Sequence, residues 1–422
     1  MYQETARELL QFIEKSPTCF HATAEMAAML EATGCQRLRE EDQWSLQPGG
    51  CYYVTRNESS LIAFSLPRAE WKGYHIMASH SDSPSFKVKE NPELVVENRY
   101  VKLNVEQYGG MLCAPWFDRP LSVAGRVIFR QGDRLTSRLV NVDRDLLMIP
   151  NLAIHMNREA NKGYSYNTQR DMLPLLGDET AKGRFMSIIA EAAGVEEEQI
   201  LGHDLFLYNR QKGTIWGAGE SFVSCGRLDD LQCAFSSLKG FLRGEKCRYA
   251  AVHCVLDNEE VGSATRQGAG STFLYDVLVR INSALGGSYE DYLCKVANSF
   301  MVSADNAHAL HPNHPDKADP VNRPAMNAGI VIKYSANQKY CTDGISAAMF
   351  KELCRQAEVP YQVFTNRSDM PGGSTLGNIA AGKVAVRAVD IGLPQLAMHS
   401  PYETAGVMDT EYLIRAAEKL FA

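Results

Sequence analysis

From about Thr214 to the C-terminus, segments with strand character alternate with amphipathic helical segments. The strand-like segments are short and rich in Val, Ile and aromatic residues, whereas the helical ones repeat apolar residues three and four positions apart. This alternation is typical of a mostly parallel sheet covered by helices on both faces. We therefore expect an α/β fold whose ligand crevice lies outside the carboxyl ends of the strands. The strands are expected at 248–257, 299–305, 328–335, 361–365 and 383–392, and the helices at 228–244, 344–359 and 409–421.

The first part of the chain adds two helical patterns, the second ending at Gly34, and two buried strands at 61–66 and 74–79. From about Ser85 to Gly213 the pattern changes to strand-like alternation with a polar segment and without strand–helix alternation. We interpret this stretch as an inserted β-rich domain, residues 86–215. Residues 1–85 and 216–422 would then form one discontinuous domain. The last helix is expected to begin with Asp409 as its N-cap.

Composition excludes several classes of protein. The chain has 422 residues, which is enough for two or three domains, and its net charge is −7. That charge argues against a nucleic-acid partner or an anionic membrane surface. No apolar run approaches the roughly 20 residues that span a bilayer, and the acidic start is unlike a secretory or transit peptide. We expect a soluble, cytoplasmic protein. Its 11 cysteines include no C-x-x-C pair, so we expect buried reduced thiols rather than disulfides or a zinc ribbon.

Several catalytic motifs are missing from the sequence. It contains no P-loop, no G-x-G-x-x-G after a strand, no G-x-S-x-G and no H-E-x-x-H. What remains is a set of metal-capable residues that follow expected strands or precede an expected helix. They are His80, Asp82, Asp229, Glu259, Glu260, Asp305 and His399.

These residue types suit a pair of divalent ions. One histidine and a few carboxylates for each ion fit zinc or another borderline metal, and two ions sharing a carboxylate form a hydrolytic site. Of the adjacent Glu259 and Glu260, one is expected to act as a general base and the other as a metal ligand. Asp82 is expected to orient the ligands from outside the ligand shell. The residues alone leave a second interpretation open, in which each is a polar group that hydrogen-bonds at a strand end or caps a helix.

Seven motifs resemble those of the aspartyl aminopeptidases, which are dizinc exopeptidases, and they occur in the order of that family. They are ASHSDSP (78–84), GRLDDL (226–231), DNEEVGS (257–263), SADNAHALHPNH (303–314), YSANQKYCTDG (334–344), SDMPGGSTLG (368–377) and LAMHSPYE (396–403). The resemblance implies a zinc-exopeptidase-like fold with one zinc held by His80, Asp229 and Asp305. It implies a second zinc held by Asp229, Glu260 and His399, with Asp229 bridging. Glu259 matches the general base and Asp82 the orienting acid.

The resemblance also implies a substrate and an assembly. The substrate is a peptide with a free N-terminal Asp or Glu, whose side-chain carboxylate meets Lys333. Met370 and Gly372 line the substrate pocket. The inserted domain mediates dimerisation, dimers form a tetrahedral dodecamer, and His155 reaches a neighbouring subunit's active site. Asp230 stands where the family usually has Asn, and Tyr334 stands where some members have His.

Other residues have plainer interpretations. His308, His311 and His314 are spaced H-x-x-H-x-x-H, but Pro312 and Pro315 break any helix that would align them, so we expect pocket lining or hydrogen bonding. Gly372 and Gly373 are expected to permit a tight turn. The alternatives are a dimetal deacylase or carboxypeptidase on the same fold, or a non-catalytic shell or cargo protein. Mn²⁺ or Co²⁺ would accept the same ligands as Zn²⁺.

Overall fold

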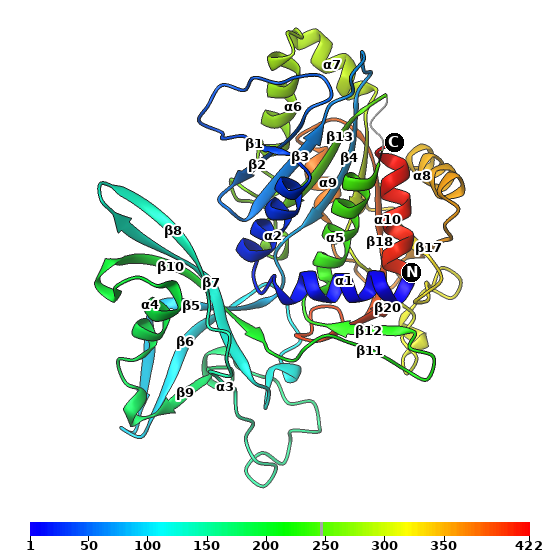
Figure 1. The fold of residues 1–422 in the computed structure, drawn as a ribbon. Helices are drawn as coiled ribbons and strands as arrows, with labels where there is room; N and C mark the ends of the chain where they lie inside the picture. The colour runs from blue at the N-terminus through cyan, green and yellow to red at the C-terminus, as the bar shows by residue number, and fades with distance from the viewer. Residues whose placement is uncertain (245–247) are drawn as a thin grey trace. The chain divides into compact units, whose positions relative to one another are not determined.

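The computed structural model describes residues 1–244 and 248–422. Its internal contacts divide the chain into two compact units (Figure 1). Unit 1 contains residues 1–82, 213–398 and 403–422, and unit 2 contains residues 83–212 and 399–402. Each unit has its own hydrophobic core. None of the described helices is both long and apolar enough to span a lipid bilayer.

Unit 1 is built on a nine-stranded sheet, as the strand–helix alternation predicts. Its four central strands, β13, β4, β14 and β18, run parallel to one another. The β2–β3 hairpin joins β13 in an antiparallel manner, and the parallel pair β16–β17 joins β18 in the same manner. The strands in sheet order are β1 (Gln36–Arg37), β2 (Cys51–Arg56), β3 (Ser60–Ser65), β13 (Ala250–Leu256), β4 (Tyr74–His80), β14 (Phe300–Ala304), β18 (Arg387–Gly392), β16 (Ile330–Tyr334) and β17 (Tyr361–Thr365).

Helices cover both faces of this sheet because alternate strand residues enter two separate cores. In β14, for example, Phe300 and Val302 pack on one face and Met301 packs on the other. The first face is covered by α1 (Tyr2–Glu14), α2 (Cys19–Ala32), α5 (Leu228–Arg243), α8 (Gly344–Ala357) and α10 (Asp409–Leu420). The second is covered by α6 (Phe273–Ala284), α7 (Tyr289–Ala297) and α9 (Leu376–Ala381).

Two details of unit 1 differ from expectation. A second, five-stranded sheet is present, in the order β11 (Thr214–Trp216), β12 (Phe222–Cys225), β20 (Glu403–Gly406), β19 (Pro394–Leu396) and β15 (Ala307–His308). The prediction of Asp409 as an N-cap is wrong, because Met408 occupies that position. The buried Asp409 carboxylate instead accepts the backbone N–H groups of Asn327 (2.7 Å) and Gly329 (3.2 Å).

Unit 2 is β-rich, as predicted. Its six-stranded sheet is antiparallel throughout, with the order β8 (Arg134–Asn141), β7 (Leu121–Gln131), β10 (Ile200–Asn209), β5 (Ser85–Val96), β6 (Tyr100–Tyr108) and β9 (Leu175–Asp178). Helix α4 (Phe185–Ala193) contributes Phe185 and Ile189 to the core of this unit. The shorter α3 (Thr168–Asp171) precedes β9.

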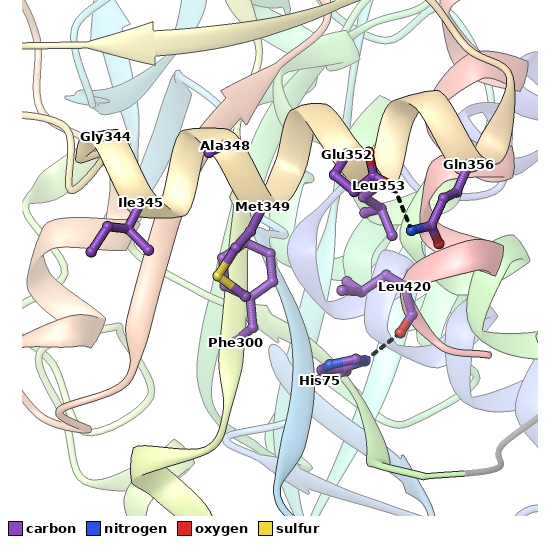
Figure 2. Close-up of a pocket in the computed structure, with 10 residues that line it drawn as sticks. All are labelled: His75, Phe300, Gly344, Ile345, Ala348, Met349, Glu352, Leu353, Gln356 and Leu420. Carbon is purple, nitrogen blue, oxygen red and sulfur yellow. Dashed lines mark hydrogen bonds between the residues drawn. The ribbon is translucent and has the colours of Figure 1, made fainter.

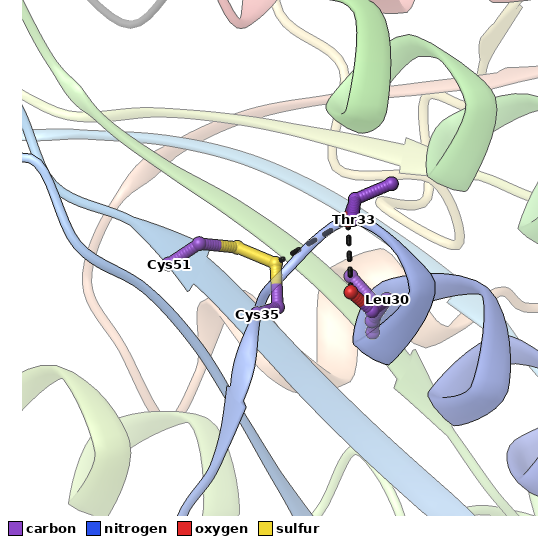
Figure 3. The surroundings of a disulfide bond; sticks show 4 residues. All are labelled: Leu30, Thr33, Cys35 and Cys51. Carbon is purple, nitrogen blue, oxygen red and sulfur yellow. Dashed lines mark hydrogen bonds between the residues drawn. A yellow bond between two sulfur atoms is a disulfide. The ribbon is translucent and has the colours of Figure 1, made fainter.

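The expectation of reduced thiols is wrong for one pair of cysteines. Cys35, just after α2, forms a disulfide with Cys51 at the start of β2 (Figure 3). The register explains the pairing, because Gln36 lies opposite Tyr52 in the parallel β1–β2 ladder and brings the preceding residues to a Cα–Cα distance of 4.6 Å. Among the described free cysteines, five are buried, two are half-buried and Cys294 is exposed. Cys247 lies outside the described residues.

Candidate metal centre

His80 is the last residue of β4, and its ring is 1% exposed. Its Nδ1 lies 3.1 Å from the main-chain oxygen of Asp82, and its Nε2 lies 3.5 Å from Asp229 Oδ1. A neutral ring that donates its Nδ1 proton to the Asp82 oxygen keeps the Nε2 lone pair for a metal. The strand end therefore presents a correctly oriented nitrogen ligand.

Asp229 and Asp230 lie in the first turn of α5, with backbone angles that are not helical. The main-chain N–H of Asp229 donates to Glu403 Oε2 (3.0 Å), and the Asp230 carboxylate accepts the main-chain N–H of His80 (3.1 Å). Both aspartates are buried. The backbone of Asp229 and the side chain of Asp230 are therefore each held by a second residue, which fixes where the two carboxylates lie.

Strands β13 and β14 flank β4 and supply the other carboxylates. Asp305 directly follows β14, and Glu259 and Glu260 lie in a single 3₁₀ turn after β13. The Asp82 carboxylate accepts the main-chain N–H groups of Glu259 and Glu260, each at 3.1 Å. Asp82 thus ties the turn after β13 to the loop after β4.

The ligand atoms meet in two overlapping groups. His80, Asp229, Asp230 and Asp305 each offer an atom within 4.8 Å of the other three, and His80, Glu259 and Glu260 form a second group of three within the same distance. Asp229 and Glu260 also offer oxygens within 4.8 Å of each other. Five of these six residues were candidates because they follow an expected strand or precede an expected helix, and the sixth, Asp230, was assigned no ligand role from the sequence.

The electrostatics of this cluster favour a bound cation. Burial and neighbouring carboxylates raise the pKa of Glu259 to about 8, and they raise the pKa values of Glu260, Asp230 and Asp305. Burial lowers the pKa of His80, but hydrogen bonds to Asp229 and Asp82 outweigh it and raise that pKa well above 6.5. Crowded acids need either protons or a cation, and one imidazole with several carboxylates is a donor set that zinc accepts. The residues therefore fit a divalent metal.

Lys333 lies at the edge of this cluster. Its side chain is buried in β16, with Nζ 3.6 Å from Asp305 Oδ1 and 5.5 Å from the centre of the Tyr340 ring. The ammonium group partly balances the charge of Asp305. Its predicted contact with a substrate carboxylate stays a prediction.

Sequence reasoning missed a buried polar network behind the ligands. The Asn306 amide donates to the main-chain oxygen of Leu228 (3.1 Å) and to the side-chain oxygens of Gln232 (3.2 Å) and Gln395 (3.0 Å). One amide therefore connects the residue after Asp305 to the residue before Asp229. Asn306 and Glu403 lie within the quoted motifs. Their residue types and positions in the sequence did not indicate that they hold the ligand segments through hydrogen bonds.

Met370 and Gly372 line a cavity of about 290 Å³ in unit 1, and so do His308, His311 and His314, as predicted for the histidines. The expectation of a tight turn at Gly372 and Gly373 is wrong, because the turn lies at 368–369. The small residue serves a close approach instead, since a Cβ on Gly372 would overlap the Asn366 amide.

Two predicted site residues lie in unit 2. His399 adopts a left-handed backbone conformation (φ 67°), and its main-chain oxygen accepts the N–H of Leu112. His155 is exposed in the segment between β8 and α3, together with the exposed apolar residues Leu152, Ile154 and Met156. The roles of both histidines stay predictions.

A larger groove of about 600 Å³ lies at the opposite end of the central strands (Figure 2). It follows one side of α8, and its lining includes Phe300 and Met349. His75, near the start of β4, closes one end, where its Nδ1 lies 2.6 Å from the main-chain oxygen of Leu420. Because β4 and β14 begin here and end at the metal centre, this groove is separate from that centre.

Comparison with known proteins gives consistent matches along the chain. Residues 12–421 match the family model described as aminopeptidase I zinc metalloprotease (M18). The chain is 46% identical to a probable M18 family aminopeptidase 2 of Clostridium acetobutylicum, covering 99% of this chain and 98% of that protein. It is 43% identical to a protein of the same description from Pseudomonas aeruginosa, covering 100% and 99%.

Solved structures extend the similarity to the fold. The chain resembles that in the cryo-EM structure of the Ape4 and Nbr1 complex, with a TM-score of 0.96 and 36% identity, covering 100% of this chain and 86% of that one. It also resembles the S. cerevisiae mApe1 dodecamer, with a TM-score of 0.87 and 28% identity, covering 100% and 97%.

Proposed function

Because this chain belongs to the M18 family and is a zinc aminopeptidase, we propose that it removes N-terminal Asp or Glu from peptides at a site for two zinc ions. The observation that carries this proposal is the cluster of the buried His80, Asp229 and Asp305 with the half-buried Glu260, beside which Asp82 holds Glu259.

We assign His80, Asp229 and Asp305 to one zinc, and Asp229, Glu260 and His399 to the other, with Asp229 shared. The grouping of the unit 1 residues supports these assignments, and the resemblance of the LAMHSPYE motif supports His399. When bound, the two ions supply Lewis acidity toward the scissile carbonyl and make an attacking water more acidic. Mn²⁺ or Co²⁺ would supply the same chemistry.

Glu259 acts as the general base and acid. Its carboxylate takes a proton from the attacking water and returns it to the leaving amine, so its proton affinity must suit both steps. Burial supports this role because it raises the pKa of Glu259. Asp82 is a positioning residue, since it accepts the main-chain N–H of Glu259 and of Glu260.

Lys333 is our candidate for acidic preference. A buried ammonium group at the edge of the cluster provides the charge that a substrate Asp or Glu side chain requires. Met370 and Gly372, which line a cavity whose lining does not include Lys333, would form another part of the substrate pocket. A deacylase or carboxypeptidase would not need a free amino terminus, so acetylation of the substrate amine distinguishes these alternatives.

The decisive variant for the chemistry is Glu259→Gln. It removes proton transfer without removing a metal ligand, and general acid–base groups contribute roughly 100- to 10,000-fold. We expect unchanged zinc content and a loss of that size in kcat on Asp-aminomethylcoumarin. Glu290→Gln, an exposed change on α7, is the control. Turnover within threefold of wild type with zinc bound would contradict the assignment.

We also propose that the chain assembles through unit 2 into dimers and a dodecamer, with His155 acting in the neighbouring subunit. The similarity to a dodecameric mApe1 and the exposed apolar residues around His155 support this. Mixing His155→Ala with Glu259→Gln after dissociation is expected to restore activity in mixed oligomers. If mass measurement confirms mixing and no activity returns, His155 does not act in trans.

A further inference from the structure

The cavity that contains Met370 and Gly372 has a strongly basic lining. We call it the basic pocket, lined by His308, His311, His314, Lys317, Arg323 and Arg367. It adjoins the segment that follows Asp305. That segment is extended, because the N–H groups of Asp305, Ala307 and Ala309 bond to the main-chain oxygens of Ile391, Leu393 and Gln395 at 2.9–3.0 Å.

The basic pocket is within peptide reach of the metal centre. His308 is three residues after Asp305 in this extended segment, so their backbones are at most about 10 Å apart. One residue of an extended substrate covers about 3.3 Å. The second or third residue of a peptide whose first carbonyl lies at the metal centre can therefore reach this pocket.

Nearby acids balance only part of the positive charge of the pocket, since Asp319 and Asp369 face Lys317, Arg323 and Arg367. Arg367 is paired with Asp369 (2.7 and 2.8 Å), which accounts for one cation. Asp319 is the acid in the lining, and its Oδ1 accepts the main-chain N–H groups of Val321 and Asn322. Among the residues that the structure describes, neither Lys317 nor Arg323 has a carboxylate oxygen within 4.0 Å, and both side chains lie in exposed residues at the cavity.

His311 adds a donor. Its Nδ1 accepts the main-chain N–H of Asn313 (3.1 Å), which leaves Nε2 to donate. Phe364, Leu310 and Met398 form an apolar part of the wall. Donors and cations beside an apolar wall suit a carboxylate on a short aliphatic stem.

We propose that the basic pocket binds a second carboxylate of the peptide, beyond the bond that is cleaved. The carboxylate belongs to an acidic side chain at the second or third residue, or to the C-terminus of a short peptide. This inference rests on the proposed aminopeptidase function and deepens it, because it selects short acidic peptides among substrates with the same first residue.

The test compares peptides that differ by one charge. The wild-type enzyme is expected to cleave Asp-Ala-Asp-amide with a kcat/KM about tenfold above that for Asp-Ala-Asn-amide, as one charge-assisted contact requires. Asp-Ala against Asp-Ala-amide tests the C-terminal carboxylate in the same way. In Lys317→Ala/Arg323→Ala these ratios are expected to approach one. Lys339→Ala/Lys383→Ala removes the same charge from exposed positions outside the pocket and is expected to keep the wild-type ratios.

Two results would overturn the inference. Equal kcat/KM values for the charged and uncharged peptides in the wild-type enzyme would show that the pocket does not bind a carboxylate. An equal loss on both members of each pair in the double variant would show that Lys317 and Arg323 act only on the structure. Cleavage of Asp-aminomethylcoumarin, which has no second residue, tests the proposed function separately; if Leu-aminomethylcoumarin is preferred, the peptide pairs are repeated with Leu first.

Discussion

The contacts of Asp82 determine how much zinc affinity or kcat its substitution is expected to remove. Its carboxylate is 3% exposed and accepts the main-chain N–H groups of Glu259 and Glu260, and it lies 3.4 Å from His80 Nδ1. Asp82→Asn keeps one acceptor oxygen and places an amide N–H against the other donor. One charge-assisted hydrogen bond is lost, which is worth about 1.5–3 kcal/mol. That corresponds to roughly a 10- to 150-fold loss in zinc affinity or in kcat.

The assay separates affinity from turnover. Zinc affinity is measured by competition with a chromogenic chelator, and kcat is measured at saturating zinc. Asp409→Asn is the matched control, because Asp409 is also a buried acid that accepts two main-chain N–H groups but holds the start of α10. We expect both variants to lose thermal stability and only Asp82→Asn to lose zinc affinity or kcat. If Asp82→Asn keeps both within threefold of wild type, the positioning role of Asp82 is wrong.

Three further predictions concern charge, pH and the disulfide. Lys333→Ala is expected to lower kcat/KM for Asp and Glu substrates roughly 10- to 150-fold more than for Ala substrates; an equal fall would leave Lys333 only as the partner of Asp305. Burial raises the pKa of Asp409 to about 7, so the folded protein keeps a proton that the unfolded chain releases, and stability falls as pH rises from about 4 to 7. The difference in Tm between pH 5 and pH 8 is therefore expected to be smaller in Asp409→Asn, and an unchanged difference would contradict this. Cys35→Ser is expected to lower stability by about 3 kcal/mol under oxidising conditions, as closure of a loop of this length implies, and equal stability with and without reductant in wild type would argue against the bond.

The order of strands and helices in unit 1 was predictable because each one shows its own hydrophobic period. Strands β13 and β14 and helices α5, α8 and α10 lie within a few residues of their expected positions. The five-stranded sheet was not predicted, because strands such as β15 and β19 have two or three residues and no period to detect. The Cys35–Cys51 pair depends on β1–β2 register, which cysteine spacing does not contain.

The candidate site was predictable in its acids and histidines but not in their supports. Metal-capable residues at strand ends are visible in the sequence, and parallel strands bring such ends together. The contacts that fix their geometry join residues far apart in the chain. Asn306 reaches Leu228 and Gln395, and Asp82 reaches the turn of Glu259. These pairings follow only from the packed structure, and their residue types are common in ordinary loops.

The sheet order explains why the site needs residues from so many segments. Strand β4 lies between β13 and β14, with neighbouring strands about 4.8 Å apart, so His80 is flanked by Glu259 and Glu260 on one side and by Asp305 on the other. Unit 2 begins directly after Asp82, and the chain returns to unit 1 at Gly213, before Asp229. The short segment that contains His399 also belongs to unit 2. Chain connectivity therefore joins unit 2 to Asp82, and unit 2 contains His399, the ligand that we propose for the second zinc, so substitutions that loosen unit 2 are expected to weaken zinc binding even where they lie far from any ligand.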